Sequence, residues 1–156
     1  MSASFLETEL QILYFAYGSN LDKTQMGRRC PQAIRRSKAM LPGYRFIINC
    51  RGVASIVADD QSKVEGLLWV LTENDEKALD HCEGVSSGYY EKRWLDVIMP
   101  DSSEIKALVY IATTNVIGTP RHGYLEKIVT AAECLEFSSS YVEHLKSWQE
   151  HARPKG

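Results

Sequence analysis

The sequence predicts an α+β fold, with strands before and between a few helices. Two observations support this prediction. Short aromatic and aliphatic runs, separated by turn residues, recur from residue 11 to residue 112, which is typical of strands. After residue 124 the apolar positions change to a spacing of three and four, which is typical of amphipathic helices. No internal repeat, low-complexity tract or linker interrupts the chain, so we expect a single domain over residues 1–156, with its core at about residues 12–148.

The first expected element is a buried strand over residues 11–17, which ends at a turn over residues 18–20. A short helix over residues 22–29 follows, and Pro31 ends it because proline cannot continue a helix. Strand-like runs then alternate with turn residues. The runs cover residues 44–48, 53–58 and 64–71, and the turn residues between them are Asn49, Gly52, Asp59 and Asp60.

A helix is expected after these strands, because residues 72–75 have the spacing of a capping box. Gly84 stands where a helix C-cap belongs. The inward-facing stripe of this helix consists of Ala78, Leu79 and Cys82.

A hairpin is expected next, because residues 89–99 and 105–112 are strand-like and flank the turn sequence Pro-Asp-Ser-Ser. Two helices then complete the fold. Their apolar faces are formed by Leu125, Ile128, Val129, Ala132 and Leu135 in the first, and by Tyr141, Val142, Leu145 and Trp148 in the second.

Composition and charge exclude several classes of protein. Hydrophobic residues make up 44% of the chain and charged residues 24%, so neither disorder nor a coiled coil is expected. The longest apolar runs fall far short of the ~20 residues that cross a bilayer. The net charge is −2, and the basic cluster over residues 28–38 fits a solvated helix end and strand face better than a phosphate-binding patch. We therefore expect neither nucleic acid nor a membrane as a partner.

The cysteines point to a reducing compartment. The four cysteines stand at positions 30, 50, 82 and 134, and no two of them have the spacing of a C-x-x-C ligand pair. No pattern typical of a secretory signal is recognised. We expect reduced, separately packed thiols and a cytoplasmic location.

A candidate ligand site lies where the first strand ends. A strand that stops at Gly-Ser-Asn and leads into a helix presents backbone N–H groups at one point, which suits a carboxylate, a phosphate or a developing oxyanion. An ordinary strand–turn–helix corner, with Ser19 or Asn20 as N-cap, also explains the local sequence. The Walker spacing is absent, which excludes nucleotide binding by that route. The residues of this candidate site are Tyr14, Phe15, Ala16, Tyr17, Gly18, Ser19 and Asn20.

Glu83 is the candidate acid–base residue. It falls at the expected end of a helix, where the macrodipole disfavours negative charge, and it has apolar neighbours. Both effects raise the pKa of a carboxyl group and favour a role in proton transfer. A surface glutamate on a frayed helix end is the alternative.

Neither a metal site nor a catalytic thiol is expected at residues 81–83. Consecutive residues of a helix point about 100° apart, so these three side chains cannot bind one ion together. A nucleophilic Cys82 would need a base, and no histidine has a diagnostic spacing from it.

Tyr124 follows a glycine- and proline-containing segment over residues 113–123, which is a candidate loop over a pocket. A phenol at the end of such a loop can bond a substrate carboxylate. The alternative is a tyrosine that is half-buried in the first turn of a helix.

Taken together, these segments resemble the γ-glutamyl cyclotransferase family, in order and over residues 12–148. The resemblance rests on Tyr-Phe-Ala-Tyr-Gly-Ser-Asn-Leu at 14–21, Val-Glu-Gly-Leu-Leu-Trp-Val-Leu at 64–71, Leu-Asp-x-x-Glu-Gly-Val-x-Ser-Gly-x-Tyr at 79–90, and the segment from Tyr124 to Ile128. The pairing of the first motif with the third at this separation makes the resemblance specific.

The resemblance implies a small closed β-barrel of mixed strands flanked by helices, commonly a homodimer, with no cofactor and no metal. It implies release of 5-oxoproline from a γ-glutamyl amide, with Glu83 as the catalyst and residues 14–20 and Tyr124 holding the substrate. Members of the family act on γ-glutamyl amino acids, γ-glutamylamines or γ-glutamyl aminoglycosides. The sequence does not determine the leaving group. It therefore does not determine whether the enzyme acts in glutathione metabolism or in antibiotic biosynthesis.

Two alternatives remain at this point. One is a hydrolase or acyl-transfer enzyme in the same pocket, with water attacking in place of the α-amine. The other is a non-catalytic module that binds γ-glutamyl or similar small molecules. A pure binder has no need for an acid in a site that raises its pKa, which argues against the second.

Overall fold

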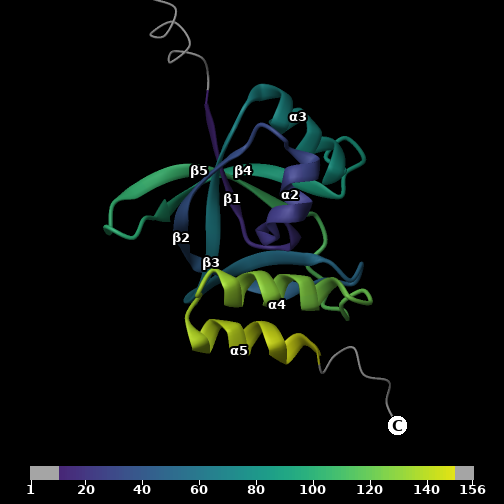
Figure 1. Ribbon diagram of the computed structural model, residues 1–156. Helices are drawn as coiled ribbons and strands as arrows, with labels where there is room; N and C mark the ends of the chain where they lie inside the picture. Colours follow the sequence, from purple (N-terminus) through teal and green to yellow (C-terminus); the bar gives the residue numbers. More distant parts are fainter. Residues whose placement is uncertain (1–10, 150–156) are drawn as a thin grey trace, which may run out of the picture.

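Five strands form a closed barrel in the order β1-β3-β2-β4-β5, as the computed structural model of residues 11–149 shows (Figure 1). The neighbouring strands are antiparallel, except that β1 and β5 run parallel where they close the barrel at Tyr14 and Leu108. The barrel of mixed strands is therefore confirmed. The strands are β1 (Ile12–Ala16), β2 (Ile34–Ile48), β3 (Ala54–Leu71), β4 (Tyr90–Ile98) and β5 (Glu104–Ala112).

The helices lie outside the barrel. Helices α4 and α5 stack on one another along one side of it, whereas α2 and α3 lie together near its other end (Figure 1). None of the helices in the described part of the chain is both long and apolar enough to cross a membrane. The helices are the 3₁₀ turn η1 (Ser19–Leu21), α2 (Lys23–Arg29), α3 (Glu73–Cys82), α4 (Tyr124–Cys134) and α5 (Ser139–Ser147).

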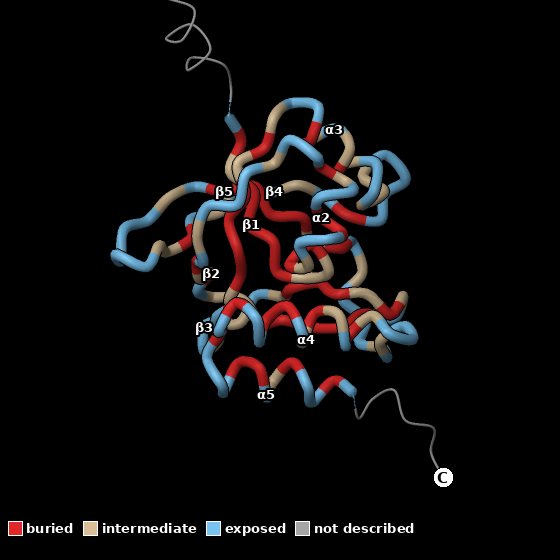
Figure 2. The backbone as a smooth tube through the Cα atoms, in the orientation of Figure 1, coloured by how far each residue is buried: buried red, intermediate tan, exposed pale blue. Residues whose placement is uncertain are grey.

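The core fills the barrel and the space beneath the helices, as the buried segments in Figure 2 show. β1 and the end of β3 contribute almost continuous runs of buried aliphatic and aromatic residues, which shows that both faces of these segments are covered. The apolar faces that were predicted for the last two helices are also buried, with Leu125, Ile128 and Leu145 almost wholly so.

Local signals predicted several element ends correctly. Thr72 and Asp75 form the predicted capping box at the start of α3, each side chain accepting the other's backbone N–H. Asp22 caps α2 by accepting a hydrogen bond from the Gln25 N–H at 2.9 Å. The predicted hairpin forms from β4 and β5.

The region over residues 34–71 differs from the prediction in two ways. Strand β2 begins at Ile34, ten residues before the predicted start. The start was missed because residues 34–38 are mostly polar and exposed, and because Pro42 and Gly43 separate the apolar residues 39–41 from the predicted strand. The predicted turn at Asp59 and Asp60 is wrong, because β3 runs on through it. Tyr44 pairs with Ala58, but Pro42 pairs with Lys63, so β3 has extra residues between these two pairs. Asp59 and Asp60 are among them and form an irregularity in a continuous strand.

Candidate active site

A cavity of about 470 Å³ opens at the end of the barrel where β1 leaves the sheet. Segments that are distant in sequence line it: the end of β1 with the turn over residues 17–20, α2, the β2–β3 connection, the end of α3 with the start of β4, β5, and the segment that leads into α4. Barrel closure brings these segments together (Figure 1). A cavity of this size holds a small organic molecule.

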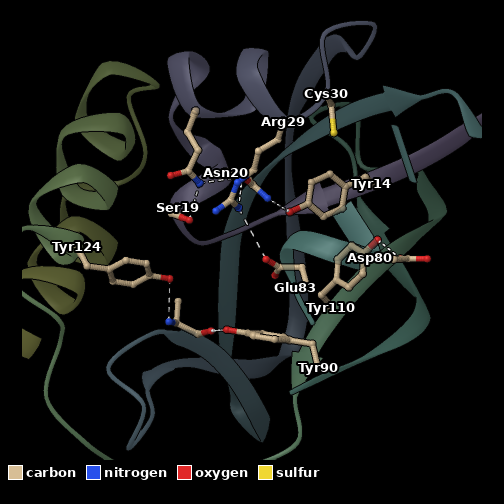
Figure 3. Close-up of polar contacts among 12 residues, drawn as sticks. Tyr14, Ser19, Asn20, Arg29, Cys30, Asp80, Glu83, Tyr90, Tyr110 and Tyr124 are labelled. Atoms are coloured by element: carbon tan, nitrogen blue, oxygen red, sulfur yellow. Dashed lines mark hydrogen bonds and ion pairs between the residues drawn. The ribbon is translucent and has the colours of Figure 1, made fainter. Parts of the chain in front are cut away.

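Glu83 is held at the cavity by the end of α3, where it is the C-cap residue and its N–H bonds the Leu79 carbonyl at 2.8 Å. Gly84 follows with φ +64°, the left-handed conformation that ends helices and favours glycine. The Glu83 side chain is 19% exposed, and its Oε2 lies 3.8 Å from Nη1 of Arg29. The side chain points to the centre of the site in Figure 3.

Burial raises the pKa of Glu83 to about 7, and the nearby guanidinium groups of Arg29 and Arg51 oppose the rise. The direction agrees with the expectation from sequence, and burial is its main cause. A carboxyl group with this pKa exchanges protons readily near neutral pH.

Asn20 organises the turn after β1. It is 3% exposed, and its Nδ2 donates to the Tyr14 hydroxyl at 2.9 Å. Its Oδ1 accepts from Gln25 Nε2 at 2.9 Å and from Arg29 Nη1 at 3.1 Å. The Asn20 side chain therefore fixes Arg29 beside Glu83 and joins β1 to α2 (Figure 3).

Two tyrosines hold the Ala54 peptide group on the opposite wall. The Ala54 N–H donates to the Tyr124 hydroxyl at 3.0 Å, and the Tyr90 hydroxyl donates to the Ala54 carbonyl at 2.7 Å (Figure 3). Burial raises the pKa of Tyr124 to about 12 and that of Tyr14 and Tyr90 far above their ordinary range. All three phenols are neutral, and because Tyr14 and Tyr124 accept hydrogen bonds, their own protons remain available to a ligand.

The structure brings most of the predicted site residues together, but not all of them. Phe15 and Ala16 do not line the cavity. Phe15 lies on the other face of β1 from Tyr14 and packs fully buried against Gly66, whereas Ala16 is fully buried and carries only a methyl group. His81 and Cys82 reach the rim, but the described residues contain no group of three His, Cys, Asp or Glu side chains placed to hold a metal. The predicted residues that line the cavity are Tyr14, Tyr17, Gly18, Ser19, Asn20, Glu83 and Tyr124.

The sequence analysis missed the arginines of the cavity, together with three of its tyrosines. Arg29 was assigned only to a solvated helix end, although its position at the end of the helix that follows the Asn20 corner was a usable signal. Arg121 lies in the segment over residues 113–123 that was predicted as a loop over a pocket, but was not itself named, and the others come from segments that the folded barrel brings to the site. The missed arginines and tyrosines are Arg29, Arg51, Tyr89, Tyr90, Tyr110 and Arg121.

The fold and the cavity define a small-barrel protein with one partly buried carboxyl group facing a ring of tyrosines and arginines. The model of the AIG2-like family matches residues 63–145, and the chain belongs to this family.

Comparison with individual proteins supports a more specific relationship, to proteins named gamma-glutamylcyclotransferase. The chain is 28% identical to the mouse protein named gamma-glutamylcyclotransferase, over 86% of this chain and 77% of that protein. It is 28% identical to the human protein of the same name, over 89% and 79%. A solved structure named gamma-glutamyl cyclotransferase superposes with a TM-score of 0.82 at 28% identity, covering 88% of each chain. YkqA from Bacillus subtilis gives a TM-score of 0.79 at 26% identity, over 97% of this chain and 58% of that one. These relatives confirm the resemblance and the fold that it implied.

Proposed function

We propose that this protein is a γ-glutamyl cyclotransferase, an enzyme that releases 5-oxoproline from a γ-glutamyl amide. The observation that carries the proposal is the Glu83 carboxyl group, held 19% exposed in a ligand-sized cavity with a pKa of about 7. The names of the mouse and human relatives support the same activity.

In the proposed reaction, the α-amine of the substrate attacks its own γ-carbonyl carbon and closes a five-membered lactam. The bond from that carbon to the leaving nitrogen then breaks. The α-amine is an ammonium ion at neutral pH, and removing a proton from a group about two pKa units above neutral costs ~2.7 kcal/mol. Glu83 accepts this proton and gives it to the leaving nitrogen as the bond breaks. The second proton, which the attacking nitrogen loses as the lactam forms, also passes to the departing amine, so the amine leaves as an ammonium ion and the Glu83 carboxylate is restored.

The other cavity residues have positioning roles in this proposal. Attack within one molecule is fast only when the chain is held folded, with the amine near the carbonyl. The start of η1 lacks a side-chain cap, so the N–H groups after Gly18 can receive the α-carboxylate or the developing oxyanion. The neutral phenols of Tyr14 and Tyr124 add two O–H donors nearby.

Product analysis tests the proposal. The purified protein is incubated with a γ-glutamyl dipeptide, a γ-glutamylamine and a γ-glutamyl aminoglycoside, and the products are measured by mass spectrometry. Release of 5-oxoproline supports cyclisation. Free glutamate would instead support hydrolysis, and saturable binding without turnover would support a binding module.

The location and the assembly are also part of the proposal. All four cysteines are free, which supports a reducing, cytoplasmic environment. Trp94 on β4 is 48% exposed, which supports self-association into a homodimer. Light scattering after gel filtration tests the second statement, and a monomeric mass at micromolar concentration would refute it.

The pH dependence of catalysis should report Glu83. Since this residue must be ionised in the free enzyme to accept a proton, kcat/KM is expected to rise with pH through about 7. Arg29 holds the pKa of Glu83 down, so Arg29→Gln should move this acid limb to higher pH, by about one pH unit. Arg28→Gln, an exposed neighbour on α2, serves as the control and should leave the limb in place. An acid limb that is identical in all three proteins would exclude Glu83 as the titrating group.

A further inference from the structure

The β2–β3 connection and the segment that leads into α4 bring positive charge to the cavity that the proposed proton transfer does not use. Among the described lining residues, three guanidinium groups face one carboxyl group. Arg29 donates a hydrogen bond to Asn20 and forms an ion pair with Glu83. Arg51 and Arg121 make no ion pair with any described carboxylate.

Arg51 is positioned as an anion-binding group. Its Cζ lies 3.9 Å from the centroid of the Tyr89 ring, a stacked arrangement that fixes the plane of the guanidinium. Its Nη1 is buried and donates no hydrogen bond to any described residue. Burying such a donor is costly unless a ligand accepts from it. Its positive charge also opposes the rise that burial causes in the pKa of Glu83 and of Tyr90, which places the guanidinium within electrostatic range of the cavity.

Tyr89 is a rigid platform for this arginine. Its N–H bonds the Gly84 carbonyl at 3.0 Å, and its carbonyl accepts from the Thr113 N–H at 3.0 Å. The ring also packs so closely on Gly84 that an added Cβ there would lie 2.7 Å from it. The segment that carries Glu83 therefore also sets the position of Arg51.

Arg121 is held beside Arg51 by the backbone. Its Nε donates to the Arg51 carbonyl at 2.9 Å, and its N–H donates to the Gly52 carbonyl at 3.0 Å. Both arginines line the cavity, and a bound anion would compensate their positive charge. Guanidinium groups match the geometry of carboxylates, which they bind with paired hydrogen bonds.

We propose that Arg51 and Arg121 bind a carboxylate on the leaving group, and that the enzyme therefore selects γ-glutamyl amino acids over γ-glutamyl derivatives of cationic amines. This inference rests on the proposed function. The γ-glutamyl part of the substrate brings one carboxylate and one ammonium, and in the proposed function the turn over residues 17–20 and Tyr124 receive that carboxylate. A second carboxylate fits the remaining pair of arginines, whereas a polyamine or an aminoglycoside would meet them with like charge.

The test uses substrates that differ only in the charge of the leaving group. Release of 5-oxoproline is measured from γ-glutamyl-alanine, from γ-glutamyl-alaninamide and from a γ-glutamyl diamine. The wild-type protein should prefer the carboxylate substrate over the amide by about 10- to 100-fold in kcat/KM, the range typical of hydrogen bonds to a charged group. Measured at pH 9, where Glu83 is ionised in both proteins, Arg51→Gln should remove most of this preference, because it slows the carboxylate substrate far more than the amide.

Two further variants complete the test. Arg121→Gln should act in the same direction as Arg51→Gln, whereas Arg93→Gln, an exposed arginine on β4, should change nothing. An equal loss on carboxylate and amide substrates would overturn the inference, because it would mean that Arg51 binds the γ-glutamyl part. Equal rates of the wild type on all three substrates would also overturn it and leave the proposed function intact. No 5-oxoproline from any substrate would overturn the proposed function, and the inference with it.

Discussion

Replacing Glu83 by glutamine is expected to lower kcat for 5-oxoproline release by about 10²- to 10⁴-fold, the usual contribution of a general acid–base group. Glutamine has nearly the same shape as glutamate, so the substrate still binds and KM changes little. It cannot accept the α-ammonium proton or deliver one to the leaving amine. Steady-state kinetics on the best substrate of the panel measures the change, and Glu91→Gln on the exposed face of β4 is the matched control.

The loss of kcat in Glu83→Gln identifies a catalytic role only if the variant is folded. The pKa of Glu83 is about 7 in the folded protein, against an ordinary 4.5, so ionisation of this group destabilises the folded state. The protonated form of Glu83 therefore favours the folded state. This contribution to the unfolding free energy is fully present below pH 4.5 and is lost as the pH rises through 7. Between pH 4 and pH 9 the wild type should therefore lose about 3 kcal/mol more unfolding free energy than Glu83→Gln does.

Denaturant unfolding at several pH values measures this difference. A variant that folds, lacks the alkaline loss of stability and is inactive would place the proton transfer on Glu83. A folded variant with wild-type kcat would refute the proposed role, whatever its pH dependence.

The sequence allowed the parts of the site that are local in the chain to be predicted. The turn after β1 and the end of α3 each carry their own signals, Gly-Ser-Asn in one case and a capped helix ending at Gly84 in the other. The spacing that predicts these elements also predicts that Glu83 lies at a helix end. Which side chains of β1 face the cavity was predicted less well, since Phe15 points into the core.

The parts of the site that depend on barrel closure could not be predicted in this way. Arg51 lies in the β2–β3 connection and Arg121 lies 70 positions further along the chain, yet the Arg121 side chain donates a hydrogen bond to the Arg51 carbonyl. Their contact follows from strand order, which neither periodicity nor composition determines. For the same reason the start of β2 was missed, because pairing with β3 holds it as a strand although residues 35–38 are polar.

Replacing Asn20 by alanine is expected to destabilise the protein by about 2–4 kcal/mol, because three polar groups lose a hydrogen bond at once and one of them, the Tyr14 hydroxyl, is buried. These groups are the Tyr14 hydroxyl, Gln25 Nε2 and Arg29 Nη1. The loss also frees Arg29 from its place beside Glu83, so kcat should fall even under conditions where the variant is folded. Urea unfolding and kinetics below the transition measure the two effects separately. Asn115→Ala, at an exposed asparagine, is the control and should change the unfolding free energy by no more than about 0.5 kcal/mol. If Asn20→Ala were as stable as this control, the hydrogen bonds of Asn20 would not be what joins β1 to α2, and the position of Arg29 would need another cause.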